Sequence, residues 1–399
     1  MNEQRKLAHI EIITALNSIE GADKIEVAEV LGWQCVVKKG EFKVGEKIIY
    51  IEVDSVMPEK PEYEFLRDRK FRIRTIRLKG QISQGLILPL RTIHTSLDTM
   101  LTSPDKIGDD VTEILGITKY LFPSEREEIN QQERRFANDK NKLRKFMMRY
   151  SWFRKLWRRY VEGYKELRRW PYWCTHTDEE RIQNIPHVIK QFADKEVYIT
   201  EKIDYQSGTW TGKMIQNPTP IIGKFLPKKY QFVVCSRNLT TNDKNSLYWK
   251  IAKKYNLEQI LKENPTLTIQ GEQGASNVQG NKYGIKEPTM WVFNIIDHEK
   301  NYHYNWTELQ SFCLKYSLQT VPILEYYDSI KVKDGRNMTY YPKLSRLGST
   351  VQELVEFSKS KSVLADIPRE GIVVRCIENG QKLLSFKVIN PDFLLKYND

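Results

Sequence analysis

Lys202 stands in a run of residues that could turn a lysine into a nucleophile. In the stretch 197–204, VYITEKID, an apolar strand delivers the lysine to a turn, with Glu201 and Asp204 beside it. An amine attacks only in its uncharged form. Burial or a nearby cation lowers the pKa of a lysine and favours that form, whereas Asp204 alone would raise it. The stretch predicts a nucleophilic lysine if cations or a metal ion reach it, and an ordinary strand lysine otherwise.

Three further residues suit contacts to a nucleotide. Arg237 follows an apolar strand, and its guanidinium fork could hold a phosphate or a ribose. Glu272 ends a strand before a glycine-rich loop, where a carboxylate can accept hydrogen bonds from sugar hydroxyls. Phe293 lies in an apolar strand and could stack on a base, although a core aromatic residue is the alternative.

Two charged residues near the C-terminus suit phosphate chemistry. Glu370 opens a β-branched strand and could hold a divalent metal, directly or through water. Lys387 lies on a strand of alternating character and could neutralise an α-phosphate. By contrast, residues 208–213 only imitate a phosphate loop: their glycines stand too close together, and Met214 follows the lysine.

These residues occur in the order of a known set of motifs. Lys202, Glu272, Phe293, Glu370 and Lys387 resemble motifs I, III, IIIa, IV and V of the covalent nucleotidyltransferases, which include ligases and capping enzymes. The motif III segment, with its later QGNKY sequence, and the segment TDEERIQN are similar to the ATP-dependent RNA ligases of the RNA ligase 5 group. The resemblance implies an α+β chain with an N-terminal OB-fold β-barrel and a C-terminal, ATP-grasp-like nucleotidyltransferase domain with antiparallel sheets.

The resemblance also implies an activity, the joining of RNA 3′-hydroxyl and 5′-phosphate ends in RNA repair. Lys202 would attack the α-phosphorus of ATP to form a lysyl-AMP, and the AMP would pass to the RNA 5′-phosphate before the 3′-hydroxyl displaces it. Asp204 and Glu370 would hold Mg²⁺ or Mn²⁺, and together with Lys202 and Lys387 they form the implied catalytic set. The implied nucleotide contacts are Thr200, Glu201, Lys202, Arg237, Glu272, Phe293 and Lys387.

Two departures from the family pattern leave other functions open. Tyr205 stands where motif I usually has glycine, and Ser385 stands where motif V often has a first lysine. A non-catalytic RNA-binding protein on a decayed ligase scaffold is therefore one alternative. A DNA ligase is another, but the chain runs only 12 residues past Lys387. That length is expected to leave no room for the C-terminal OB domain and motif VI of DNA ligases and capping enzymes.

The elements that must position these residues fall into three parts. Residues 1–103 predict an OB-fold, or alternatively an SH3-like barrel, from strands separated by turn signals. Residues 104–171 are predicted to form a linker and a basic helical segment, and residues 172–399 are predicted to form the nucleotidyltransferase domain. The expected strands are 10–16, 25–31, 34–38, 47–53, 71–78, 85–90, 197–203, 232–236, 267–272, 290–296, 371–376 and 383–388, and the expected helices are 245–262, 306–316 and 350–359.

Residues 134–169 hold 14 of the basic residues against three acids, so this segment carries +11 of the net charge of +12. Aromatic and aliphatic residues recur there at helical spacing. This pattern fits three alternatives: a solvated helix packed on a neighbouring domain, a surface that binds a polyanion, or a helix that lies on an anionic membrane.

The bulk composition narrows the class of protein. The 399 residues, 40% hydrophobic and 29% charged, predict a soluble chain of two or three domains without a membrane span or a secretory signal. Five scattered cysteines predict neither disulfides nor a zinc site. We therefore expect an intracellular monomer, cytoplasmic or nuclear, whose partner is RNA.

Overall fold

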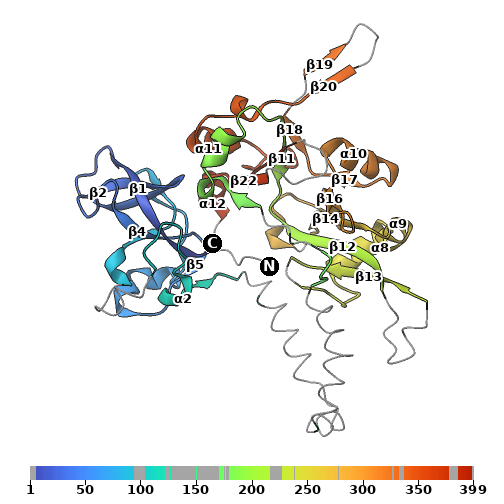
Figure 1. Ribbon diagram of the computed structural model, residues 1–399, viewed down its shortest axis with the longest axis horizontal. Helices are drawn as coiled ribbons and strands as arrows, with labels where there is room; N and C mark the ends of the chain where they lie inside the picture. The colour runs from blue at the N-terminus through green and yellow to red at the C-terminus, as the bar shows by residue number, and fades with distance from the viewer. Residues whose placement is uncertain are drawn as a thin grey trace.

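Two β-rich units lie side by side in the computed structural model (Figure 1). The structure describes residues 6–93, 104–121, 126, 150, 170–174, 176, 179–215, 227–237, 239–276, 278–325, 328–331, 337–376 and 385–397. The predicted basic helix at 134–169 lies outside the described residues, apart from Tyr150.

The first unit is an antiparallel sheet in the order β3-β2-β1-β4-β8. Its long strand β1 pairs through its first half with β4 and through its second half with β2, and a bulge between Ile13 and Ala15 separates the two pairings. A bulge bends a strand, so one strand can serve both sides of a curling sheet, as an OB-fold requires. The strands are β1 Ala8–Ser18, β2 Ile25–Val30, β3 Trp33–Lys38, β4 Lys47–Ile51 and β8 Leu86–Pro89.

Part of the expected linker packs against this sheet. Val111, Leu115 and Ile117 are buried in the same hydrophobic cluster as Ile10 and Ile49. The expected strand 71–78 forms only from residue 76, because Lys70 and Phe71 take left-handed backbone angles. The short elements are β5 Ser55–Val56, η1 Pro61–Arg69, β6 Ile76–Leu78, β7 Gln81–Ser83, η2 Leu90–Thr92, α2 Thr112–Leu115 and β9 Thr118–Lys119.

The second unit contains a five-stranded and a six-stranded sheet, both mainly antiparallel, which confirms the expected α+β class. One sheet has the order β10-β22-β21-β11-β18 and the other the order β13-β12-β14-β15-β16, with β17 beside β15. Strand β12 replaces the glycine-containing run that imitated a phosphate loop. The strands are β10 Glu180–Arg181, β11 Val197–Lys202, β12 Gln206–Ile215, β13 Lys229–Cys235, β14 Leu267–Gly274, β15 Thr289–Asp297, β16 Tyr302–His303, β17 Gln319–Thr320, β18 Ile323–Glu325, β21 Gly371–Cys376 and β22 Ser385–Ile389.

Helices cover these sheets and bury the largest core, which includes Trp210, Ile269 and Leu309. The expected helix 245–262 is two helices, because Asn256 takes a left-handed conformation between them. A hairpin of β19 Asp328–Lys331 and β20 Asn337–Tyr340 projects from this unit (Figure 1). The helices are α7 His187–Gln191, α8 Leu247–Lys254, α9 Leu257–Glu263, α10 Trp306–Lys315, α11 Val351–Ser358 and α12 Pro391–Tyr397, with short turns η4 Ile182–Asn184, η6 Gln279–Asn281 and η7 Leu344–Arg346.

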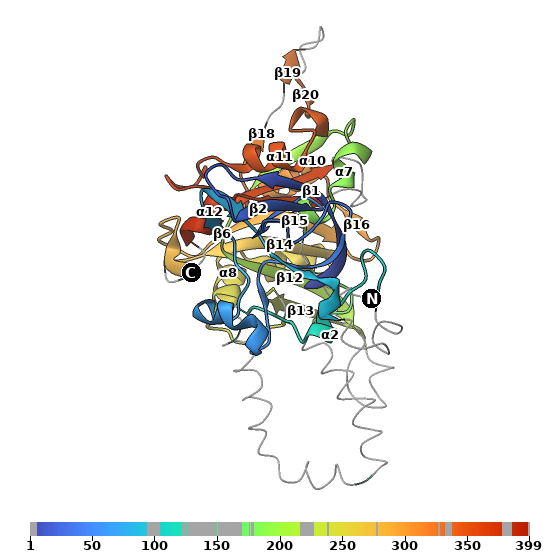
Figure 2. The same ribbon diagram turned by 90° about the vertical axis from the view of Figure 1, so that its left-hand side faces the viewer.

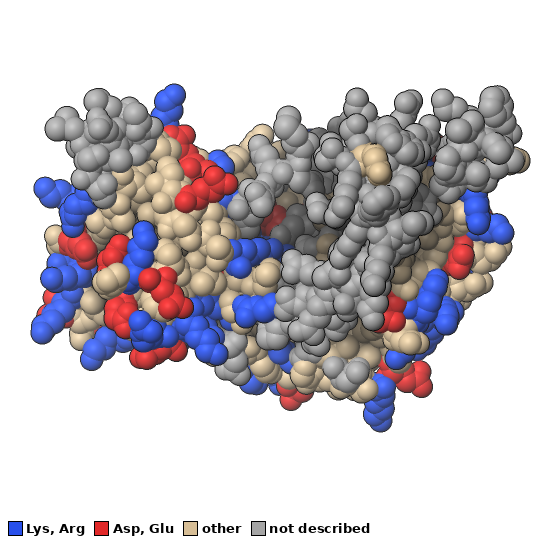
Figure 3. All heavy atoms as spheres, turned by 90° about the horizontal axis from the view of Figure 1, so that it is seen from below, with Lys and Arg blue, Asp and Glu red and all other residues tan. Residues whose placement is uncertain are grey.

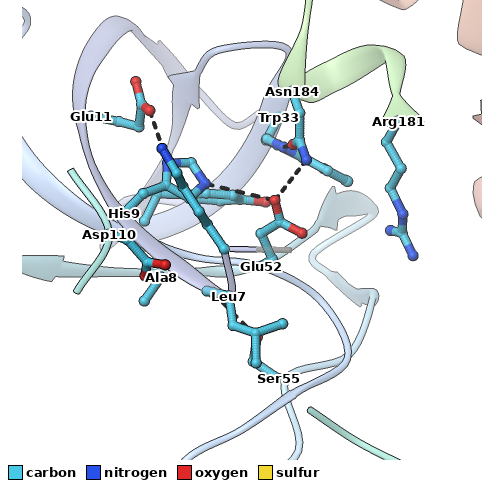
Figure 4. Close-up of polar contacts among 12 residues, drawn as sticks. Leu7, Ala8, His9, Glu11, Trp33, Glu52, Ser55, Asp110, Arg181 and Asn184 are labelled. Carbon is cyan, nitrogen blue, oxygen red and sulfur yellow. Dashed lines mark hydrogen bonds and ion pairs between the residues drawn. The ribbon is translucent and has the colours of Figure 1, made fainter. Parts of the chain in front are cut away.

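The two units are joined by a partly buried polar contact (Figure 4). Asn184 accepts a hydrogen bond from the Trp33 indole N–H at 2.6 Å and donates one to Glu52 at 2.6 Å. The amide of Gly32 donates to the carbonyl of Gln183 at 2.9 Å, and a Cβ on Gly32 would come within 2.9 Å of the Gln183 backbone. The OB sheet therefore lies directly against the segment that leads into the second unit; Figure 2 looks onto the OB unit with the second unit behind it.

The described surface carries both signs of charge (Figure 3), and the cysteines are thiols. Basic and acidic side chains are interspersed over the visible described surface (Figure 3). None of the five cysteines, all of them described, forms a disulfide, as the sequence predicts. Among the described residues, no helix is both long and apolar enough to cross a membrane.

Candidate active site

Strands β11 and β21 bring Lys202 and Glu370 together. Lys202 pairs with Gly371 across the two strands, so the side chain of the preceding Glu370 reaches the lysine. The Lys202 Nζ donates a hydrogen bond to Glu370 Oε1 at 2.5 Å. Gly371 is needed for this approach, because a Cβ there would lie 2.2 Å from the carbonyl oxygen of Val388 on β22.

The Lys202 amine is surrounded by acids. Burial, the largest single effect, pushes the pKa of Lys202 down, but the charges of Glu370, Glu272 and Asp204 outweigh it and raise the pKa above its ordinary value. These acids therefore favour the protonated ammonium form of Lys202. The expected cations are present as well: the charge of Lys387 acts on Glu370, and that of Arg237 acts on Glu272.

Glu272 enters the same site from the second sheet. Ser207 and Glu272 are paired across β12 and β14, and the Ser207 hydroxyl donates to Glu272 Oε1 at 2.6 Å. Burial raises the pKa of Glu272 to about 7, against the opposing effects of Lys202 and Ser207. The sequence had no signal for Ser207, because its partner lies 65 residues away.

Two buried carboxylate oxygens in this site lack partners. Oε2 of Glu272 and Oε2 of Glu370 are both buried, and neither has a hydrogen-bond partner among the described residues. A buried acceptor without a partner is costly, so these oxygens fit a ligand that supplies donors, such as a ribose hydroxyl or metal-bound water. No three His, Cys, Asp or Glu side chains of the described chain are grouped closely enough to hold a metal. Carboxylate oxygens such as those of Glu370 suit a hydrated divalent ion, bound directly or through its water molecules.

The turn after Lys202 is held by three consecutive residues from the loop after β14. The Asn281 side chain accepts a hydrogen bond from the Tyr205 hydroxyl at 2.6 Å. Lys282 forms an ion pair with Asp204. The Tyr283 hydroxyl accepts a hydrogen bond from the Asp204 amide at 2.9 Å. The motif match included these residues, but no pattern indicated that they hold motif I.

Tyr205, the first departure from the family pattern, is accommodated by the second sheet. Its ring is nearly parallel to Trp291, with centroids 6.1 Å apart. A Cβ on Gly274 would lie 2.4 Å from the Tyr205 ring, so the glycine leaves the space that the ring fills. The aromatic residue at 205 is thus packed and hydrogen-bonded.

Ser385, the second departure, lies next to an arginine. Its hydroxyl accepts a hydrogen bond from Arg375 Nε at 3.2 Å, and Arg375 also bonds Glu179 at 2.9 Å. A lysine at 385 would place a second cation against this guanidinium. The remaining motif V residue, Lys387, pairs with Val373 on β21 and with Arg181 on β10.

The other predicted nucleotide contacts lie at different depths. Phe293 is half-buried with the Arg375 guanidinium 5.7 Å from its ring centroid, so one side of the ring faces a cation. Thr200 is buried and, by strand alternation, shares a face of β11 with Lys202. Glu201 points to the other face, where its carboxylate accepts a hydrogen bond from the Val363 amide at 2.8 Å. Its contact with a nucleotide stays a prediction.

Comparisons with known proteins agree with this arrangement. Residues 7–90 match an OB-fold domain family, and residues 195–389 match the RNA ligase family. A search of curated proteins finds no match.

Solved structures of one RNA ligase resemble the whole chain. The chain is similar to Naegleria gruberi RNA ligase with pyrophosphate (27% identity, TM-score 0.71, covering 99% of this chain and 100% of that chain). It is also similar to a mutant of that ligase with ATP and Mn (26% identity, TM-score 0.71, 99% and 100% covered) and to another with AMP and Mn (25% identity, TM-score 0.70, 99% of both). Residues 195–389 therefore belong to the RNA ligase family, and the chain is an RNA ligase with an OB-fold domain ahead of its ligase domain.

Proposed function

We propose that this RNA ligase uses ATP and that Lys202 carries the AMP as a covalent lysyl-AMP. The observation that carries the proposal is the position of Lys202, whose amine lies 2.5 Å from Glu370 and within the field of Glu272 and Asp204. Lys202 lies where the two sheets meet, beside the carboxylate oxygens of Glu272 and Glu370 that lack hydrogen-bond partners among the described residues. This position suits attack by the amine on the phosphorus atom of a nucleotide whose ribose and phosphates lie next to it.

In the first step, Lys202 reacts with ATP. The Lys202 ammonium loses a proton, for which Glu370 is the adjacent acceptor, and its nitrogen attacks the α-phosphorus of ATP. A nitrogen–phosphorus bond forms while the bond between the α-phosphorus and the bridging oxygen breaks, and pyrophosphate leaves with the electron pair. Lys387, whose charge already acts on Glu370, is placed to neutralise charge on the α-phosphate.

The nucleotide is held by groups from both sheets. Glu272, with its unpartnered oxygen, accepts from the ribose, Arg237 binds phosphate or ribose, and Phe293 stacks on the adenine. Asp204 and Glu370 would hold a hydrated Mg²⁺ or Mn²⁺, which would offset the phosphate charge and favour the uncharged lysine.

RNA takes part in the two later steps. The 5′-phosphate of one RNA end attacks the lysyl-AMP, which releases Lys202 and leaves an RNA-adenylate, and a 3′-hydroxyl then displaces AMP to form the phosphodiester. We assign the adenylation chemistry to residues 172–399 and infer that the OB-fold unit and the basic segment at 134–169 bind the RNA. The enzyme acts as a monomer in the cytoplasm or the nucleus.

The proposal is tested by sealing of a nicked duplex that carries RNA on the 3′-hydroxyl side. Full-length protein with ATP and Mn²⁺ is expected to seal this nick, and to seal a matched nick with DNA on the 3′-hydroxyl side more slowly. Sealing without any ATP requirement, or sealing of the DNA nick alone, would contradict the proposal.

A further inference from the structure

Lys282 forms the second lysine–carboxylate pair of the site, and the proposed chemistry does not use it. Its ammonium contacts Asp204, while Lys202 contacts Glu370. Both carboxylates proposed to hold the metal are thus occupied by lysines of the same chain. Lys202 must leave its carboxylate to become a nucleophile, but Lys282 has no covalent role that would explain its position.

An aromatic seat on α12 holds the Lys282 ammonium in place. The rings of Phe393 and Tyr397 have centroids 5.0 and 5.1 Å from its Nζ, and the two rings lie 4.8 Å apart. Cations are attracted to the faces of aromatic rings within about 6 Å. The seat is itself anchored, because Phe393 is buried and Asp392 on the same helix pairs with Arg77 of the OB unit at 3.2 Å.

Asp204 does not depend on Lys282 for its position. Its amide is fixed by the Tyr283 hydroxyl, and the following Tyr205 is fixed by Asn281. If the lysine side chain were lost, the carboxylate would remain in the turn and would lack its neutralising charge. Because the Asp204 side chain is only 25% exposed, the field of a lysine in contact with it is incompletely screened by water.

We propose that Lys282 is a built-in counter-ion that pairs with Asp204 and competes with the divalent metal for this carboxylate. The inference rests on the proposed function, since it takes Asp204 as one of the acids that hold the metal. Lys282 is a positioning residue. It offsets the charge of Asp204 and sets how much free metal the enzyme needs, and the seat on α12 strengthens its hold on Asp204.

The test measures the dissociation constant of Mn²⁺ for the full chain without nucleotide. Binding is monitored through the electron paramagnetic resonance signal of the free ion. We expect Lys282→Met to lower the dissociation constant for Mn²⁺ about tenfold, because a neighbouring like charge is removed. Lys343→Met removes a surface lysine that pairs with Asp194 at 3.5 Å, and it is expected to change nothing. Unchanged or weaker binding by Lys282→Met would overturn the inference.

Two further variants separate the inference from the proposed function and guard against misfolding. Asp204→Asn is expected to weaken Mn²⁺ binding, and binding equal to that of the unmodified enzyme would instead refute the proposed metal site. Tyr397→Leu leaves Lys282 intact but removes one ring of its seat, so we expect a tightening of about threefold. Tyr397→Phe keeps the ring and is expected to bind as the unmodified enzyme does. If neither Lys282→Met nor Tyr397→Leu binds Mn²⁺ more tightly than the unmodified enzyme does, the counter-ion role is excluded.

Discussion

Lys202 on β11 and Glu370 at the start of β21 form an ion pair at 2.5 Å, although 168 residues separate them in the sequence. The carboxylate of Glu370 favours the protonated form of the lysine. The enzyme must therefore break this pair before it can react with ATP.

Replacement of Glu370 tests the pair. Glu370→Gln is expected to reduce formation of the lysyl-AMP by more than about 100-fold, because an oriented charge at the reacting group is lost. The residual labelling should have its pH inflection at a lower pH than that of the unmodified enzyme, since Glu370 raises the pKa of Lys202. Labelling is measured over a pH series with ATP labelled at the α-phosphorus. An inflection at a higher pH would contradict the assignment.

The fit between Tyr205 and Gly274 predicts a coupled effect on stability. Gly274→Ala places a methyl group 2.4 Å from the Tyr205 ring and is expected to lower the free energy of unfolding by about 1–3 kcal/mol. In a Tyr205→Leu background the same change should cost less, because the ring is gone. A double-mutant cycle by urea unfolding measures this difference. Equal costs in both backgrounds would show that the two residues are not coupled.

The contact between the units predicts the effect of losing Asn184. Asn184→Ala leaves the Trp33 indole N–H and buried Glu52 without this partner, which should cost about 1–3 kcal/mol of the free energy of unfolding. Gln259→Ala removes an exposed amide that bonds Glu263, and it serves as the control with little expected effect. Thermal unfolding of both variants is the measurement, and equal stability would argue against the buried contact.

His9 makes the stability of the OB unit depend on pH. Burial lowers the pKa of its imidazole, but Glu11 and Glu52 outweigh burial and raise it to about 9 (Figure 4). This stabilisation is complete below the ordinary pKa near 6.5 and is lost as the pH rises to 9, because over this range the folded state keeps a proton on His9 that the unfolded state has already released.

The loss amounts to about 3 kcal/mol at most. Unfolding of the unmodified protein and of His9→Gln between pH 6.5 and 9 should show that the stability difference between them shrinks as the pH rises. A difference that stays constant or grows would contradict the charged state of His9.

Local patterns in the sequence predicted the strands that carry the chemistry. The strands that carry or flank Lys202, Glu272, Glu370 and Lys387 are apolar or β-branched and follow clear turn signals, so β11, β14, β21 and β22 were expected within a few residues. Strand β12 was missed, because Gly208 and Gly212 suggest a loop. In the structure Gly212 instead leaves room for the Tyr230 ring, whose hydroxyl a Cβ would meet at 1.9 Å.

Contacts between distant segments could not be predicted from one sequence. Lys282 lies 78 residues from Asp204, and no spacing rule links them. The break at Asn256 was missed for a different reason: helix propensity continues through that position, and only the observed left-handed backbone divides α8 from α9. Tyr205 was recognised as a departure, but its compensation by Gly274 depends on the packing of two strands.

Covalent labelling of Lys202 tests the central claim most directly. The full chain is incubated with Mn²⁺ and ATP radiolabelled at the α-phosphorus, denatured, digested and analysed by mass spectrometry. The account predicts one AMP on the peptide that contains Lys202, its release by pyrophosphate, and no label on Lys202→Ala. Label on Lys202→Ala at the level of the unmodified enzyme, or on a different lysine, would contradict the account.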